Sequence, residues 1–173
     1  MTNIRRYPTN GAPVFITAVT ANRTPILASE ENKKLLLEII REVKIEHDFS
    51  MLGYVILSDH FHLIIKTRDA DISKIMQSIK LRFTRRYIKQ TATTEAQPVS
   101  LWQRRFWDHL IRDENDFQRH LDYIHYNPVK HGIVRSANEY IFSSFHAYVE
   151  RGAYSFDWGV GVAPPQVSTM DIE

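Results

Sequence analysis

Two histidines separated by a single phenylalanine, in the run His60-Phe61-His62, are the first residues of the chain that could do chemistry. An apolar run follows them, and it predicts a strand over residues 60–67. Successive side chains of a strand point to opposite faces, so His60 and His62 share one face, about 7 Å apart along the chain, while Phe61 faces the core. Two imidazoles on a rigid strand form half of a metal site, although a His-x-His pair alone is more often incidental.

A second group of polar side chains lies in residues 120–128, HLDYIHYNP. Tyr123 and Asn127 are four residues apart and so share one helical face, and His120 lies one turn before Tyr123. If this face packs over the two histidines, a phenol and an amide oxygen converge on the imidazoles. The amide could complete a His-His-Asn metal site, and a phenol held against a metal-bound phosphate can act as a nucleophile.

Other residues compete for these roles. Tyr126 is the rival nucleophile, but it points about 300° around the helix from Tyr123, so one of the two should miss the site. Tyr123 could also be a core tyrosine with its hydroxyl hydrogen-bonded. We expect His120 to lie at the surface or beside the ligands, not among them. The remaining histidines near these motifs are interpreted as structural or surface residues: His109, His125, His131 and His146.

The bulk composition is that of a single globular protein of 173 residues, with 43% hydrophobic and 24% charged residues. The absence of cysteine excludes disulfides and thiolate metal sites. No apolar leader or long apolar run is present, so we expect a cytoplasmic location and no membrane partner. A net charge of +2 says little about nucleic acid. We expect one domain over residues 1–158 and a flexible tail over residues 159–173.

The periodicity of apolar residues predicts four strands, over residues 13–21, 51–57, 60–67 and 106–112. A helix capped by Ser29 should run to about residue 47, and a second should follow a cap at Asp69 or Asp71. A third is expected over residues 114–126, ended by Asn127-Pro128, and a fourth over residues 139–151. The order β-α-β-β-α-β predicts an α+β, ferredoxin-like fold with an antiparallel sheet and extra C-terminal helices. Those helices are free to cover the histidine face.

Basic residues gather in residues 80–89, KLRFTRRYIK, which contain no acid. A basic helical face with interleaved aromatics suits single-stranded nucleic acid, although such a run is usually just a solvated face. Two arginines before the fourth strand and two in an N-terminal arm add charge. The residues predicted to contact DNA are therefore Arg82, Arg85, Arg86, Lys89, Arg104, Arg105, Arg5 and Arg6.

The two motifs together resemble those of the single-tyrosine HUH transposases, and in particular their REP-associated tyrosine transposase branch. The resemblance rests on His60-Phe61-His62 followed by Tyr123-Ile124-x-x-Asn127-Pro128-Val129-Lys130-x-Gly132. The 102–107 segment and the Arg112-Asp113-Glu114 turn are also similar, and the likeness spans about residues 13–150. Ser58 departs from the pattern, because relatives often have proline there; we expect this to alter the turn and not the chemistry.

The resemblance implies cleavage and rejoining of single-stranded DNA. A divalent metal, Mg²⁺ or Mn²⁺, would be held by His60, His62 and Asn127, and Tyr123 would attack the scissile phosphate to leave a 5′-phosphotyrosine and a free 3′-OH. REP-associated relatives bind short palindromic DNA hairpins with a single-stranded flank. They resemble monomers, whereas insertion-sequence relatives are homodimers that share sites. Imidazole ligands by themselves suit Zn²⁺ better, so Mg²⁺ or Mn²⁺ rests on the resemblance.

Two other functions remain open from the residues. One is a DNA-hairpin-binding protein derived from a transposase that no longer cuts, although all the expected chemical residues are present. The other is a zinc hydrolase acting on a small phosphoester, which would need an acidic third ligand. Its candidates, Asp59 and Asp122, lie on the wrong faces by simple periodicity.

Overall fold

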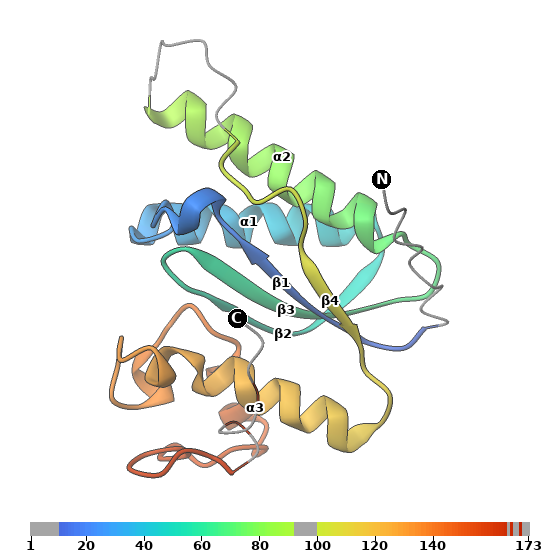
Figure 1. Cartoon of the computed structure of the whole chain (residues 1–173). Helices are drawn as coiled ribbons and strands as arrows, with labels where there is room; N and C mark the ends of the chain where they lie inside the picture. The colour runs from blue at the N-terminus through green and yellow to red at the C-terminus, as the bar shows by residue number, and fades with distance from the viewer. Residues whose placement is uncertain (1–10, 92–99, 166, 168–169, 171–173) are drawn as a thin grey trace.

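The computed structural model describes residues 11–91, 100–165, 167 and 170. It contains a four-stranded antiparallel sheet with the strand order β2-β3-β1-β4. The helices α1 and α2 lie on one side of this sheet and α3 lies on the other (Figure 1). The strands and α-helices are β1 (Val14–Val19), α1 (Glu30–Glu46), β2 (Phe49–Ile56), β3 (His60–Thr67), α2 (Ile72–Thr91), β4 (Trp107–Leu110), α3 (Glu114–Lys130) and α4 (Phe145–Glu150). This strand order confirms the ferredoxin-like, α+β prediction.

The alternation of β3 places its two kinds of side chain as predicted. Phe61 packs edge-on against Trp102, which in turn contacts Phe83 of α2, so Phe61 lies on the α1/α2 side. His62 contacts Tyr123 of α3 and so lies on the opposite side of the sheet. The strand therefore buries both faces, one in the main core and one under α3.

The starts of α1 and α2 follow from side-chain caps. Ser29 Oγ accepts a hydrogen bond from the Asn32 amide at 3.2 Å, as expected for an N-cap serine. Asp71 Oδ1 accepts from the Ser73 amide at 2.7 Å, which decides between the two aspartates that the sequence left open. Both caps satisfy amide groups that have no partner within the helix.

The end of α3 corrects the sequence-based expectation. The helix does not stop at Asn127-Pro128 but continues to Lys130, with Pro128 in its last turn. Proline lacks an amide N–H, and at this position it forfeits only one backbone bond near the helix end. The amide of His131 donates to the Asn127 carbonyl at 3.0 Å, so the last turn closes normally. Gly132, with φ of +67°, then turns the chain away.

The helix predicted over residues 139–151 is present only in its second half. A short 3₁₀ turn, η2 (Ala137–Glu139), is followed by extended chain, and only Phe145–Glu150 forms a helix, α4. Ser143 bridges to Val55, and the Ile56 amide donates to the Phe142 carbonyl at 2.9 Å. The free edge of β2 offers these backbone partners, and pairing with it outweighs the local helical pattern.

Smaller differences concern the sheet edges and the tail. β4 covers Trp107–Leu110, shorter than the predicted 106–112, and β1 and β2 differ from prediction by one to two residues at their ends. Within the segment predicted to be a tail, the Val167 side chain is buried; the division at residue 158 stays a prediction. Within the described ranges, no helix is both long and apolar enough to cross a membrane.

Gly53 of β2 lets α3 approach the sheet closely. A Cβ atom at this position would lie 2.9 Å from Leu121 Cδ1, and Leu121 is itself buried. We therefore expect Gly53→Val to lower the free energy of unfolding by about 1–3 kcal/mol, the usual cost of overpacking a core. Urea denaturation measures this difference. Ser50→Val, at an exposed position of the same strand, is the matched control; equal stability of the two variants would contradict the close packing.

Candidate active site

Four side chains from two elements of one chain meet between the sheet and α3. The ring centres of His60 and His62 lie 5.0 Å apart, and the centre of the Tyr123 ring lies 5.4 Å from that of His62. Asn127 Nδ2 donates to His62 Nε2 at 3.4 Å. All four side chains are buried. The helical face predicted to carry the phenol and the amide does pack over the strand face that carries the imidazoles.

Neighbouring residues hold the two imidazoles in defined orientations. His60 Nδ1 lies 2.6 Å from Asp59 Oδ1, and His62 Nδ1 lies 2.9 Å from Thr17 Oγ1. A carboxylate can only accept, so the hydrogen of His60 lies on Nδ1. Asn127 donates to Nε2 of His62, so the hydrogen of that ring also lies on Nδ1. Both Nε2 atoms therefore carry the lone pair, in the arrangement that orients metal-ligating histidines.

Asp59 keeps its charge in this setting. Burial by itself would raise its pKa, but hydrogen bonds and charge interactions with His60 and Arg23 outweigh burial and hold the pKa below the usual value. The Arg23 guanidinium donates to Asp59 Oδ2 at 3.1 Å. Asp59 is thus a fixed anion that orients the His60 ring through a hydrogen bond to its Nδ1 atom.

This donor set fits a divalent ion. The His60 and His62 ring centres lie 5.0 Å apart, and the Asn127 amide lies 3.4 Å from His62 Nε2, so two imidazoles and one amide are gathered in one place. The Asn127 amide now turns its nitrogen to His62, and rotation about the broad terminal torsion of asparagine would present Oδ1 instead. The residues predicted to hold a metal are therefore compatible with one, and their role as ligands stays a prediction.

Two residues near the end of α3 were missed as members of the site. Lys130 donates to Tyr123 Oη at 3.5 Å, with its Nζ 4.9 Å from the centre of the ring. The centre of the His131 ring lies 5.4 Å from the centre of the His60 ring. Lys130 is seven residues after Tyr123, so helical spacing could have found it. Ending the helix at Asn127 hid that signal.

The rival residues lie elsewhere. The Tyr126 ring packs against Trp158, with 6.2 Å between ring centres. Asp122 accepts hydrogen bonds from the Tyr154 hydroxyl at 2.6 Å and from Gln118 at 2.7 Å. Asp122 is therefore hydrogen-bonded to residues other than the two histidines, and Asp59 is hydrogen-bonded to Nδ1 of His60. Neither carboxylate is placed as the acidic third ligand that a zinc hydrolase would need.

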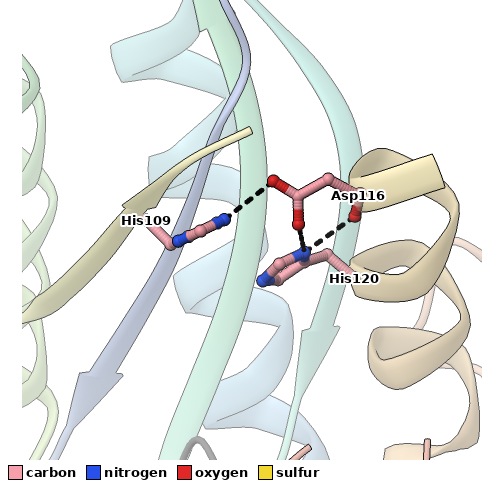
Figure 2. A group of neighbouring side chains, drawn as sticks. All are labelled: His109, Asp116 and His120. Atoms are coloured by element: carbon pink, nitrogen blue, oxygen red, sulfur yellow. Dashed lines mark hydrogen bonds and ion pairs between the residues drawn. The ribbon is translucent and has the colours of Figure 1, made fainter. Parts of the chain in front are cut away.

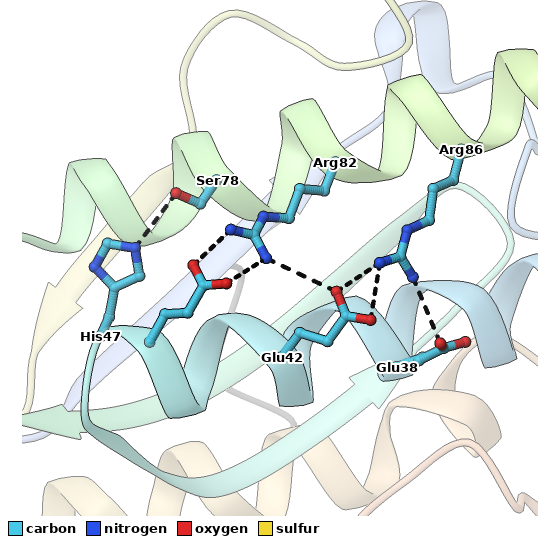
Figure 3. Close-up of polar contacts among 7 residues, drawn as sticks. Glu38, Glu42, His47, Ser78, Arg82 and Arg86 are labelled. Atoms are coloured by element: carbon cyan, nitrogen blue, oxygen red, sulfur yellow. Dashed lines mark hydrogen bonds and ion pairs between the residues drawn. The ribbon is translucent and has the colours of Figure 1, made fainter.

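The basic residues of α2 fall into two groups: some pair with acidic residues of α1, and others are exposed to solvent. Arg82 and Arg86 reach across to α1, where they pair with three glutamates (Figure 3): Glu38, Glu42 and Glu46. Arg82 Nη1 lies 2.8 Å from Glu46 Oε1, and Arg86 Nη2 lies 2.7 Å from Glu42 Oε2. Arg85 and Lys89 are exposed to solvent. A DNA-binding role for Arg82 and Arg86 would have to coexist with their packing of α2 onto α1.

Two further predicted DNA contacts border an open groove. Arg104 and Arg105 are exposed, and with Lys80 they line a groove between α2 and residues 100–106. Lys80 Nζ donates to the Gln103 carbonyl at 2.6 Å and so ties the two walls together. The predicted contacts Arg5 and Arg6 lie outside the described residues.

Comparison with known proteins relates this chain to transposases. Residues 12–127 match the family model described as "Transposase IS200 like". A REP-associated tyrosine transposase of Escherichia coli K12 is 36% identical, over 91% of this chain and 91% of that protein. A Haemophilus influenzae protein named in the same group is 37% identical, over 92% of this chain and 94% of that one. A solved structure of a REP-associated tyrosine transposase bound to a REP hairpin matches over 100% of both chains, with a TM-score of 0.79 and 33% identity.

Proposed function

This chain belongs to the IS200-like transposase family, and we propose that it cleaves and rejoins single-stranded DNA at hairpins of repeated palindromic elements. The observation that carries this proposal is the meeting of Tyr123, His60, His62 and Asn127 in one buried cluster. Hairpin DNA as the partner is supported by the structural relative, which is bound to a REP hairpin.

In the proposed reaction, Tyr123 Oη attacks the scissile phosphorus. An Oη–P bond forms and the P–O3′ bond breaks, which leaves a 5′-phosphotyrosine and a free 3′-OH; the phenol proton ends on the departing oxygen by way of solvent. Lys130 Nζ, 3.5 Å from Oη, counters the negative charge that develops there. Attack of a 3′-OH on the phosphotyrosine reverses the exchange of bonds, so rejoining needs no external energy.

We assign His60, His62 and Asn127 as the residues that would hold a divalent ion, Mg²⁺ or Mn²⁺. When bound, such an ion supplies Lewis-acid polarisation of the scissile phosphate. Asp59 and Thr17 hold the two rings through their Nδ1 atoms, so each ring would bind the ion through Nε2. The family relationship supports divalent metal use, while the choice of Mg²⁺ or Mn²⁺ over Zn²⁺ rests on the resemblance of the motifs.

One chain supplies both the nucleophile and the histidines, which favours catalysis by a monomer over a homodimer with shared sites. The contact between the Tyr123 and His62 rings lies within a single chain. A homodimer that exchanges α3 would have to break it. Because the proposed substrate is cellular DNA, we place the protein in the cytoplasm.

A hairpin oligonucleotide with single-stranded flanks, labelled at one end, tests the proposal. Incubation of the protein with Mg²⁺ or Mn²⁺ should give a labelled band of protein mass on a denaturing gel. If the folded protein binds the hairpin and yields no adduct or cleaved strand with either ion, it is the non-cleaving hairpin-binding protein instead.

The basic groove gives a prediction about salt dependence. Removing Arg104 and Arg105 together should make the slope of log K against log salt concentration shallower by about 1.4, or about 0.7 for each lost single-strand phosphate contact. Binding isotherms at several salt concentrations measure the slope. The matched control is Lys34→Ala with Lys44→Ala, which removes the same charge from exposed positions of α1. An identical slope for both double variants would show that the groove does not contact the backbone.

A further inference from the structure

A second cluster of metal-ligating side chains lies outside the site just described. It consists of His109 on β4 and Asp116 and His120 on α3, with the carboxylate between the two imidazoles (Figure 2). Phe15 contacts both clusters: the centre of its ring lies 4.8 Å from that of His120 and 5.4 Å from that of His62. We propose that His109, Asp116 and His120 bind a divalent transition-metal ion of the zinc type.

The spacing of these groups fits coordination. One ligand atom from each residue lies within 4.8 Å of the others. Asp116 Oδ2 lies 2.9 Å from His109 Nε2, and Asp116 Oδ1 lies 3.1 Å from His120 Nδ1, so the carboxylate bridges the two rings. His120 would bind the ion through its other ring nitrogen, Nε2. Donor atoms of a tetrahedral ion with bonds of about 2.0–2.2 Å stand at similar separations. The His109 and His120 rings are stacked, with centres 4.6 Å apart and planes inclined by 16°, so binding would require at least one imidazole to rotate.

His120 is already in the form that a metal ligand needs. Its Nδ1 lies 2.8 Å from the Asp116 backbone carbonyl, which can only accept, so Nδ1 carries the hydrogen and Nε2 the lone pair. A ring N–H fixed on a backbone carbonyl is the usual support of a ligating histidine.

Hydrogen bonds hold the Asp116 carboxylate in place. His109 Nε2 donates to Asp116 Oδ2 at 2.9 Å. The Arg112 amide donates to Oδ2 at 3.0 Å, and the Asp116 amide donates to Asp113 Oδ1 at 2.8 Å, so the start of α3 fixes this carboxylate. Ionised oxygens with two imidazoles form a donor set that suits Zn²⁺ and not Mg²⁺.

The site remains open on one side, since the side chains of His109 and Asp116 are 22% and 18% exposed. Water could occupy a fourth position from that side. His109 now donates its Nε2 hydrogen to Asp116, and coordination through Nε2 would move that proton to Nδ1 of the same ring. The ion would tie β4 to the first turns of α3, the helix that carries Tyr123 and Asn127.

The competing interpretation is a metal-free hydrogen-bonded clamp between β4 and α3. Calorimetric titration of the untagged full chain with Zn²⁺ separates the two. His62→Ala removes a ligand of the first cluster, and we expect this variant to keep one equivalent of bound Zn²⁺ and to melt at a higher temperature when zinc is added. The His62→Ala/His109→Ala double variant should lose both effects. His62→Ala/His47→Ala is the matched control, because His47 lies on the α1/α2 side, and it should retain both effects.

Absence of zinc binding by folded His62→Ala, or zinc binding that survives in the His62→Ala/His109→Ala double variant, would overturn the proposal. If His62→Ala does not fold, imidazole nitrogen NMR of the wild-type chain decides instead. The ring resonances of both His109 and His120 should then shift once two equivalents of zinc have been added. Unchanged resonances of either ring would leave the cluster as a clamp only.

Discussion

Tyr123→Phe will form no covalent adduct with hairpin DNA, whatever divalent ion is supplied. Tyr123 is fully buried, and its ring contacts Phe15 and His62, so phenylalanine keeps the packing and removes only the hydroxyl. The loss of one hydroxyl hydrogen bond should change stability by about 1 kcal/mol or less. The reaction, in contrast, loses its nucleophile outright. Denaturing gels of the wild type and the variant with the same labelled hairpin measure the difference.

Tyr126→Phe is the matched control for this experiment. Its ring packs on Trp158 and not on the histidines, so this variant should form adduct at the wild-type rate. Adduct formation by Tyr123→Phe, or loss of the adduct in Tyr126→Phe alone, would identify Tyr126 as the nucleophile instead of Tyr123. Hairpin binding by both variants, followed by a native gel shift, should be unchanged.

His62→Ala is expected to have the second largest effect. A bound ion supplies several kcal/mol of transition-state stabilisation, and a loss of about 4 kcal/mol corresponds to about a 1000-fold lower cleavage rate. His62 also contacts Thr17, Asn127 and Tyr123, so its removal disturbs the rest of the cluster. Single-turnover cleavage over a range of Mn²⁺ concentrations measures the loss.

The expected result for His62→Ala is a rate that excess Mn²⁺ does not restore, with hairpin affinity retained. His146→Ala serves as the control, because that ring bonds the Asn138 carbonyl at 2.8 Å, near η2. A His62→Ala variant that cleaves within a few-fold of the wild type would exclude the histidine pair as the ion site.

The sequence was most informative where one physical rule decides the outcome. Alternation along a strand placed His60 and His62 opposite Phe61, and four-residue spacing placed Tyr123 with Asn127; both predictions are confirmed as geometry. The order of strands and helices predicted the ferredoxin-like sheet, because few topologies accommodate that order. That these residues perform catalysis stays a prediction.

The sequence was misleading where two rules compete. Pro128 disfavours a helix, but its cost near the end of α3 is one backbone bond, and the last turn persists. Residues 140–144 could extend a helix, but the open edge of β2 binds them as extended chain. Helical spacing placed four basic residues on one face of α2, yet the glutamates of α1 that engage Arg82 and Arg86 come from distant sequence. These outcomes depend on tertiary contacts that local patterns do not contain.

Peptide mapping of the covalent adduct tests the central claim most directly. Trypsin should cut after Arg119 and Lys130 and release residues 120–130, which contain both Tyr123 and Tyr126. After nuclease digestion, fragment ions from tandem mass spectrometry locate the residual 5′-nucleotide between these two tyrosines. We predict the added mass on Tyr123. Added mass on Tyr126, or an adduct that maps outside residues 120–130, would contradict the assignment of this helix as the source of the nucleophile.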